Sequence, residues 1–122
     1  MPGGGSKPYP NPHRIKTCAE FFRGRFLNDM VRDNSLTDGV CLRTPDHARF
    51  LFYKEDAEAV RVDLSKMAGP QRAVAVDALR PYQEMDLGLM EARDQTWKPP
   101  HKSDWAIAVG RFERRQAVKR SP

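Results

Sequence analysis

The chain has 122 residues, enough for one small domain, and 39% of them are hydrophobic and 30% charged. The net charge of +5 suggests a nucleic-acid-binding protein, but the basic excess lies at the two ends. Residues 1–16 carry three basic residues and residues 111–122 carry five with one acidic, which leaves 13 basic and 15 acidic residues in 17–110. The central part is therefore slightly acidic, and nucleic acid is not its expected partner. Binding to an anionic surface or to nucleic acid through the basic ends stays an alternative.

Membrane insertion is not expected either. The sequence has no apolar run long enough to span a bilayer, and residues 1–16 lack the apolar segment of a signal peptide. The sequence alone gives no location. We expect the domain to be secreted or periplasmic only if it is part of a longer exported protein.

The first element in chain order is a short helical turn. Residues 1–16 are rich in glycine and proline and are predicted to be a flexible segment. Thr17 followed by Glu20 has the spacing of a capping box, which predicts a turn of helix over 18–22 that Gly24 ends. The apolar side chains expected to pack this segment on the main body are those of Phe21, Phe22, Phe26, Leu27 and Met30.

From residue 38 the hydrophobic period changes to two, which is typical of strands. Residues 38–54 predict two strands joined by a turn at 44–47, where Pro45 occupies the second position. Both faces of residues 50–53 are apolar, which indicates a central strand covered on two sides. A strand over 59–64 follows, and the short charged link at 54–58 predicts that it forms a hairpin with the strand before it.

Four further strands are predicted over 72–77, 82–88, 94–98 and 104–109, the second of them weakly patterned. Turn residues separate all the strands, and no helix is long enough to connect parallel neighbours. The sequence therefore predicts an all-β fold, an antiparallel β-sandwich of about six to eight short strands over residues 17–110. Residues 111–122 are predicted to be a basic tail.

The two cysteines are too few for a disulfide framework. Cys41 lies in an alternating apolar stretch, which predicts a buried free thiol. A Cys18–Cys41 disulfide is the alternative that the sequence leaves open.

No pattern of catalytic or metal-binding residues stands out. The three histidines fall in predicted loops or tails, and their spacing to cysteine and to acidic residues resembles no metal site. His101 and Asp104 are close enough in sequence to share a proton. Asp77 and Glu84 lie near strand ends, where acidic residues are common in turns. We therefore expect a non-catalytic domain without metal or cofactor.

The aromatic residues are the remaining candidates for ligand contacts, because exposed rings stack on sugars and on proline-rich peptides. Trp105 alternates in phase with Ile107 and Val109, which predicts a core position. Trp97 precedes Pro99 in an edge-like segment and is the strongest candidate for an exposed contact. Tyr53 and Tyr82 are the weaker candidates.

Several of these residues match a known domain family in order and spacing. The matching features are Tyr53, the sequence VRVDL at 60–64, Asp77, Pro99-Pro100 and Asp104-Trp105. In them the chain resembles the collagen-binding domain family, small C-terminal β-sandwiches that follow a glycoside-hydrolase-like or collagenase domain in bacterial secreted proteins.

The resemblance implies a non-catalytic accessory domain that binds a glycan or a collagen-like polymer. The alternative that it leaves open is a domain that only packs on an adjacent catalytic barrel. At residues 75–81 the family has Trp-x-Asp-Pro-Arg-x-Gly, and this chain keeps only Asp77 of that motif. Asp77 therefore joins Trp97, Tyr53 and Tyr82 as a candidate ligand-binding residue.

Overall fold

A computed structural model describes residues 12–112, with side chains described from Lys16 onward. Most of the two ends predicted to be a flexible segment and a basic tail, at 1–11 and 113–122, lies outside the described residues. The elements in chain order are helix α1 (Pro12–Phe22), strand β2 (Val31–Arg32), the 3₁₀ helix η1 (Asn34–Leu36), and strands β3 (Val40–Arg43), β4 (Phe50–Ala57), β5 (Val60–Asp63), β6 (Gln71–Asp77), β7 (Met85–Met90), β8 (Asp94–Trp97) and β9 (Ser103–Val109). The predicted all-β fold with about six to eight strands is confirmed.

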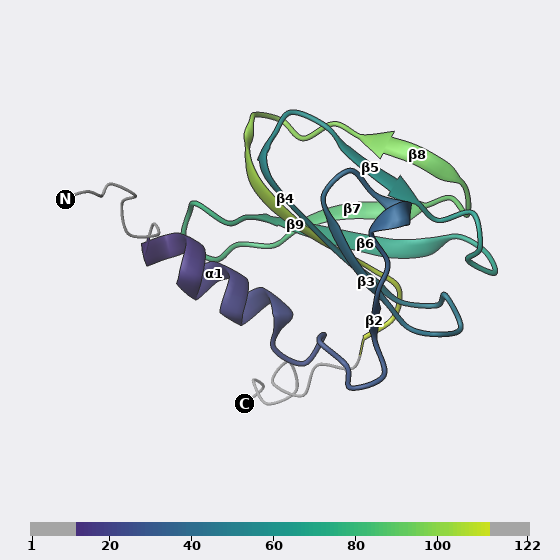
Figure 1. Ribbon diagram of the computed structural model, residues 1–122. Helices are drawn as coiled ribbons and strands as arrows, with labels where there is room; N and C mark the ends of the chain where they lie inside the picture. Colours follow the sequence, from purple (N-terminus) through teal and green to yellow (C-terminus); the bar gives the residue numbers. More distant parts are fainter. Residues whose placement is uncertain (1–11, 113–122) are drawn as a thin grey trace.

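Two antiparallel sheets and one helix form three layers (Figure 1). The larger sheet has the strand order β2-β3-β4-β9-β6-β7, and every neighbouring pair is antiparallel. Strands β5 and β8 form a second sheet of their own. This small sheet covers one face of the larger sheet, and α1 lies against the other face.

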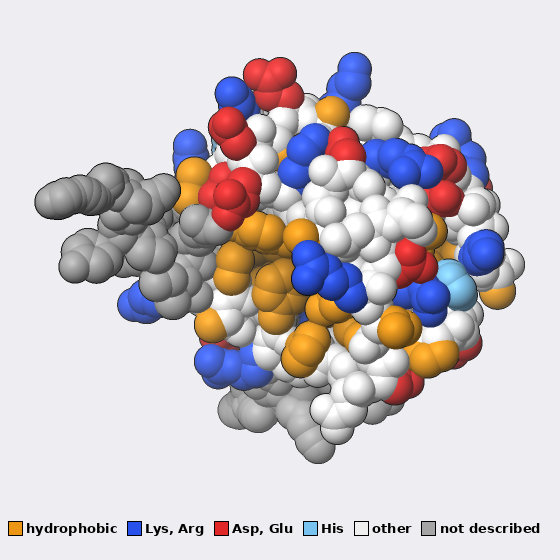
Figure 2. Space-filling model, in the orientation of Figure 1, with side chains coloured by type: hydrophobic (Ala, Val, Ile, Leu, Met, Phe, Trp, Pro, Cys, Tyr) orange, Lys and Arg blue, Asp and Glu red, His pale blue; other side chains and the backbone are white. Residues whose placement is uncertain are grey.

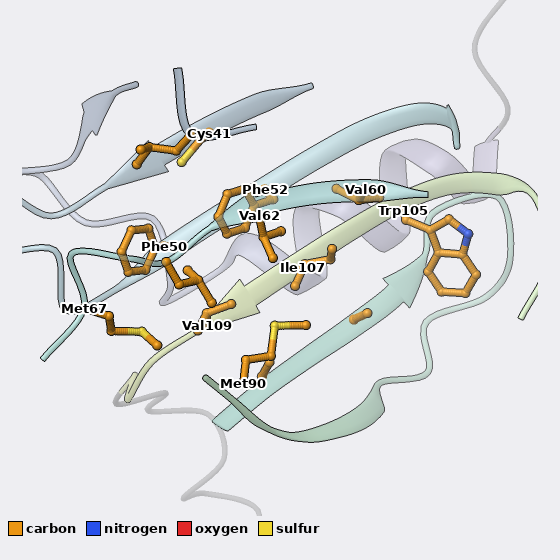
Figure 3. Close-up of a cluster of buried hydrophobic side chains, with 14 of the residues drawn as sticks. Cys41, Phe50, Phe52, Val60, Val62, Met67, Met90, Trp105, Ile107 and Val109 are labelled. Carbon is orange, nitrogen blue, oxygen red and sulfur yellow. The ribbon is translucent and has the colours of Figure 1, made fainter. Parts of the chain in front are cut away.

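Each face of the larger sheet has its own apolar cluster. Phe50, Phe52 and Ile107 face the small sheet and pack with Val60 and Val62 of β5 (Figure 3). The alternate positions on the same strands face the helix, in a cluster that contains Phe21, Leu51, Val76, Ala106 and Ala108. The prediction that residues 50–53 form a central strand covered on both sides is confirmed. Strand β4 lies between β3 and β9, and its alternate residues belong to the two apolar clusters.

The helix begins earlier than the sequence predicted. The predicted cap, Thr17, lies within α1, and the helix already begins at Pro12, inside the segment predicted to be flexible. Proline is favoured in the first turn of a helix because that turn needs no donor from its backbone nitrogen. The buried Thr17 hydroxyl instead donates to the carbonyl oxygen of Arg80 at 2.5 Å and so ties the helix to the loop after β6. None of the described helices is long and apolar enough to cross a membrane.

The turn at 44–47 is confirmed, since the His47 amide donates to the carbonyl oxygen of Thr44 between β3 and β4. The predicted hairpin between residues 50–53 and 59–64 is wrong, because β5 pairs with β8 and not with β4. The pairing of β4 with β9 shifts register between Lys54 and Ala57, and Asp56 has a positive φ of 54°. The chain therefore leaves the larger sheet at this point and crosses to the second one.

Two smaller expectations also need correction. The weak strand predicted over 82–88 is β7, but it lies over Met85–Met90 and continues past Gly88. Phe26 was expected to pack on the main body, and its side chain is instead 63% exposed. Phe21 is fully buried as predicted, because it faces the larger sheet from the last turn of α1.

Candidate functional site

A polar cleft of about 290 Å³ lies at the end of the sandwich where β6 ends and β9 begins. Asp77 is the last residue of β6 and pairs in register with Trp105 of β9. The loop at 78–84 leads from Asp77 to β7, and the loop before β9 brings His101 to the same place. The residues that line the cleft are Asp77, Arg80, Pro81, Gln83, Glu84, Met85, His101 and Trp105.

Asp77 holds the two loops of this cleft together. Its Oδ1 accepts hydrogen bonds from the Ser103 hydroxyl at 2.5 Å and the Leu79 amide at 3.0 Å. Its Oδ2 accepts a bond from His101 Nε2 at 2.6 Å, and Arg80 Nε lies 3.5 Å from the same oxygen. Partial burial raises the pKa of Asp77, but the hydrogen bonds from Ser103, His101 and the Leu79 amide outweigh it and hold the pKa below its usual value. The carboxylate is therefore ionised and fixed in place at neutral pH.

Glu84 is held on the other side of the cleft by two partners. Arg25 Nη1 donates to Glu84 Oε2 at 2.9 Å, and the Tyr82 hydroxyl donates to the same oxygen. Arg25 is itself unusual, because only 9% of its side chain is exposed and its guanidinium lies 4.6 Å from the centre of the Phe21 ring. Its Nη1 also donates to the Phe21 carbonyl oxygen at 3.0 Å, while its buried Nε has no partner among the described residues.

The two tryptophans pack on each other between the sheets. Trp105 is buried as predicted, and its Nε1 donates to the carbonyl oxygen of His101 at 3.0 Å. Trp97 meets it edge to face, with ring centres 5.3 Å apart and planes at 87°. Trp97 is half-buried and packs against the core, so only part of its ring faces solvent.

The structure brings some of the predicted ligand-binding residues together and separates others. Asp77 lines the cleft, and Tyr82 bonds to Glu84, which also lines it. Trp97 is not a lining residue, but its ring packs on that of Trp105, which is one. Tyr53 lies away from the cleft, in a groove on the helix side of the larger sheet.

His101 and Asp104 are close enough in sequence to share a proton, but the bond that His101 forms is to Asp77. The Asp104 carboxylate accepts a bond from the Asp56 amide. Sequence reasoning also missed Arg25 and Arg80. Residues 21–26 contain three phenylalanines and two arginines, which signals a cation beside aromatic rings but does not say which arginine is buried.

The second feature is an apolar groove of about 1,040 Å³ between α1 and the strands β3 and β4. Its lining is Cys18, Ala19, Phe22, Arg23, Gly24, Phe26, Val40, Leu42, Leu51, Phe52 and Tyr53. Figure 2 shows hydrophobic side chains gathered on this face, over the helix and the strands beside it. Phe26 and Val40 are among the most exposed large hydrophobic residues of the described chain.

The cysteines do not form a disulfide. Both Cys18 and Cys41 are in the thiol form, and Cys41 is buried as the sequence predicted. Among the residues that the structure describes, no group of three His, Cys, Asp or Glu side chains lies close enough to hold a metal ion.

Two solved structures share this fold. One is described as the crystal structure of a glycoside hydrolase family 5 from Bacteroides vulgatus ATCC 8482, and it matches with a TM-score of 0.64 and 17% identity over 80% of this chain and 23% of its own. The other is described as a glycoside hydrolase, with a TM-score of 0.60 and 16% identity over 80% of this chain and 24% of its own. The likeness is one of fold.

This chain spans about a quarter of the length of those structures. No protein-family model matches it, and no curated protein matches it in sequence. It is therefore similar to one part of two larger glycoside hydrolases, without an assigned family.

Proposed function

We propose that this chain is a non-catalytic accessory domain that packs on the catalytic part of a glycoside hydrolase through the apolar groove. The groove between α1 and β3–β4 is the observation that carries the proposal. Its walls expose apolar side chains from three elements to solvent, with Phe26 63% exposed. A contiguous apolar surface gains free energy when it is covered, which favours contact with another domain at this groove.

The size of the chain supports a catalytic domain as the occupant. The two solved glycoside hydrolases contain this fold as about a quarter of their length, so the other three quarters are available to cover it. Arg23 lines the groove just after α1 and pairs with Glu20 at 3.5 Å, which puts a charged pair beside the apolar lining. An apolar centre with a polar rim is typical of interfaces between protein domains.

The test measures hydrogen exchange of this chain alone and together with the catalytic domain. The catalytic domain is either part of the protein encoded by the full reading frame or a separate domain encoded beside it. We expect slower exchange over 18–26 and 40–53 when the catalytic domain is present. Phe26→Ser should weaken the association more than about tenfold, as expected for truncation of a central interface phenylalanine. Leu89→Ser is the matched control, because Leu89 is also 63% exposed but lies on β7, outside the groove. Equal exchange in the two proteins, or equal effects of the two variants, would contradict the proposal.

Ligand binding is a second function that one observation favours. Of the residues expected to contact a ligand, Asp77 lines the cleft and Tyr82 bonds to Glu84, another lining residue. An extended glycan or a collagen-like polymer is the ligand that the family resemblance implies. Retention of the isolated chain on a panel of insoluble polysaccharides and collagens tests this function, and the absence of retention at high protein concentration contradicts it.

A further inference from the structure

We infer that the cleft beside Asp77 binds one neutral sugar residue, presented by a glycan as a chain end or a side branch. The inference rests on the second function proposed above and names its site and ligand class. It depends on the size of the cleft, on the hydrogen-bonding groups around it and on the balance of their charges.

The size of the cleft selects a small ligand. Its volume of about 290 Å³ lies at the lower limit of small-molecule sites, roughly 300–1,000 Å³. One sugar ring fits such a space, whereas the three chains of a collagen helix cannot enter it. Of the two polymers that the resemblance implies, the cleft therefore favours the glycan.

The groups around the cleft match the needs of a sugar, whose hydroxyls each donate and accept. Arg80 brings donors on a largely exposed guanidinium, and Gln83 brings both a donor and an acceptor on its amide. His101 gives its Nε2 hydrogen to Asp77, so its Nδ1 is an acceptor when the ring is neutral. Met85 and the almost fully buried Trp105 make up apolar lining of the cleft, which suits the carbon face of a sugar ring.

The acidic side chains of the cleft and His101 are held in place before a ligand arrives. The Asp77 carboxylate is fixed by Ser103 and the Leu79 amide, and in turn it orients His101. Glu84 is fixed by Arg25, whose side chain is nine-tenths buried. A site that is already ordered loses less conformational entropy on binding, so even a few hydrogen bonds give measurable affinity.

The charges of the cleft argue against an ionic ligand. An anion attracted by Arg80 would lie beside the carboxylates of Asp77 and Glu84, which repel it. A cation attracted by those carboxylates would face Arg80, and Arg25 already neutralises Glu84. A neutral ligand with many hydroxyl groups avoids both conflicts.

The experiment titrates the full 122-residue chain with the methyl glycosides of glucose, galactose, mannose and xylose, up to about 50 mM, and follows amide and side-chain NMR signals. We expect at least one glycoside to shift the signals of Gln83, Met85 and His101 in a saturable way. Sodium acetate and methylamine are the ionic comparisons. Shifts with acetate or methylamine and none with any glycoside would overturn the inference, as would no shift with any probe.

Two variants assign the binding to the cleft. Arg80→Ala should weaken glycoside binding about tenfold, since it removes a charged hydrogen-bond donor. Arg72→Ala is the matched control, because Arg72 is an equally exposed arginine that pairs with Asp86 on β6 and β7, outside the cleft. Equal affinities of the two variants would overturn the inference. If the natural chain is retained on an insoluble polysaccharide and Arg80→Ala is retained equally well, the glycan-binding function stands but its assignment to the cleft is wrong.

Discussion

Asp77 is the residue on which the order of the polar cleft depends, because it bonds to both loops that form it. We expect Asp77→Asn to lower the free energy of unfolding at pH 7 by about 1–3 kcal/mol, since a buried acceptor is replaced. Asp29→Asn is the control, because Asp29 is exposed and its loss should cost less than about 0.5 kcal/mol. Urea denaturation measures both, and equal stabilities of the two variants would show that the Asp77 bonds contribute little.

The same variant has a predicted pH dependence. Because the pKa of Asp77 is lower in the folded protein than in the unfolded chain, its contribution to stability is present above the unfolded value, about 3.9. That contribution is lost as the pH falls through the lower folded pKa. The difference in unfolding free energy between the natural chain and Asp77→Asn should therefore shrink as the pH falls below about 4. A difference that grows on acidification contradicts this assignment.

The cleft also shows how far single residues can be predicted from sequence. Asp77 could be chosen in advance because it ends an alternating strand, and Trp105 because it alternates in phase with Ile107. The partner of His101 could not be predicted from the sequence, because the loops at 78–84 and 98–102 meet only after β6 and β9 pair. Closeness in sequence suggested Asp104 as the partner of His101. The pairing of two strands that lie far apart in sequence places Asp77 there instead.

The two thiols should differ sharply in reactivity. Burial raises the pKa of the Cys41 thiol to about 12, and its side chain is inaccessible, whereas Cys18 lines the open groove. Iodoacetamide at pH 8, followed by peptide mass spectrometry, should modify Cys18 first and Cys41 only after unfolding. A catalytic domain seated in the groove should slow the labelling of Cys18. Native labelling of both thiols at one rate would contradict the predicted burial.

At the scale of the elements, the end of β9 depends on one glycine. Gly110 has a φ of +116°, and a Cβ at this position would lie 2.5 Å from the carbonyl oxygen of Ala48. We expect Gly110→Ala to lower the free energy of unfolding by more than about 2 kcal/mol, from backbone strain and the clash together. Gly69→Ala is the control, because its Cβ meets open space, and should change stability by less than about 0.5 kcal/mol. Thermal unfolding of the two variants measures the difference.

The elements themselves were largely readable from the sequence, and their pairing was not. The period of two located strands β3 to β9, because each of them has a face on an apolar cluster, whereas both residues of β2 are exposed. The partner of β5 was missed, since a short charged link favours a hairpin and the positive φ of Asp56 that redirects the chain leaves no sequence signal. The start of α1 was missed because the segment rich in glycine and proline was predicted to be flexible.

At the scale of the whole molecule, Trp97 of β8 and Trp105 of β9 pack on each other and so join the small sheet to the large one. Trp97 was a candidate ligand contact, and its half-buried, edge-to-face position on Trp105 gives it a packing role as well. The two roles predict different effects of Trp97→Ala. A ring that served only as a ligand contact could be removed with little loss of stability.

We expect Trp97→Ala to lower the free energy of unfolding by about 2–3 kcal/mol, somewhat less than the 3–5 kcal/mol typical of a fully buried tryptophan. The fluorescence of Trp105, the one tryptophan left, should shift to longer wavelength because its ring edge becomes hydrated. Thr96→Ala is the control, since Thr96 is the neighbouring residue of β8 on the exposed side, and should cost less than about 1 kcal/mol. If both variants are equally stable, the ring does not hold the sheets together, and its exposed part becomes the better explanation for its place in the chain.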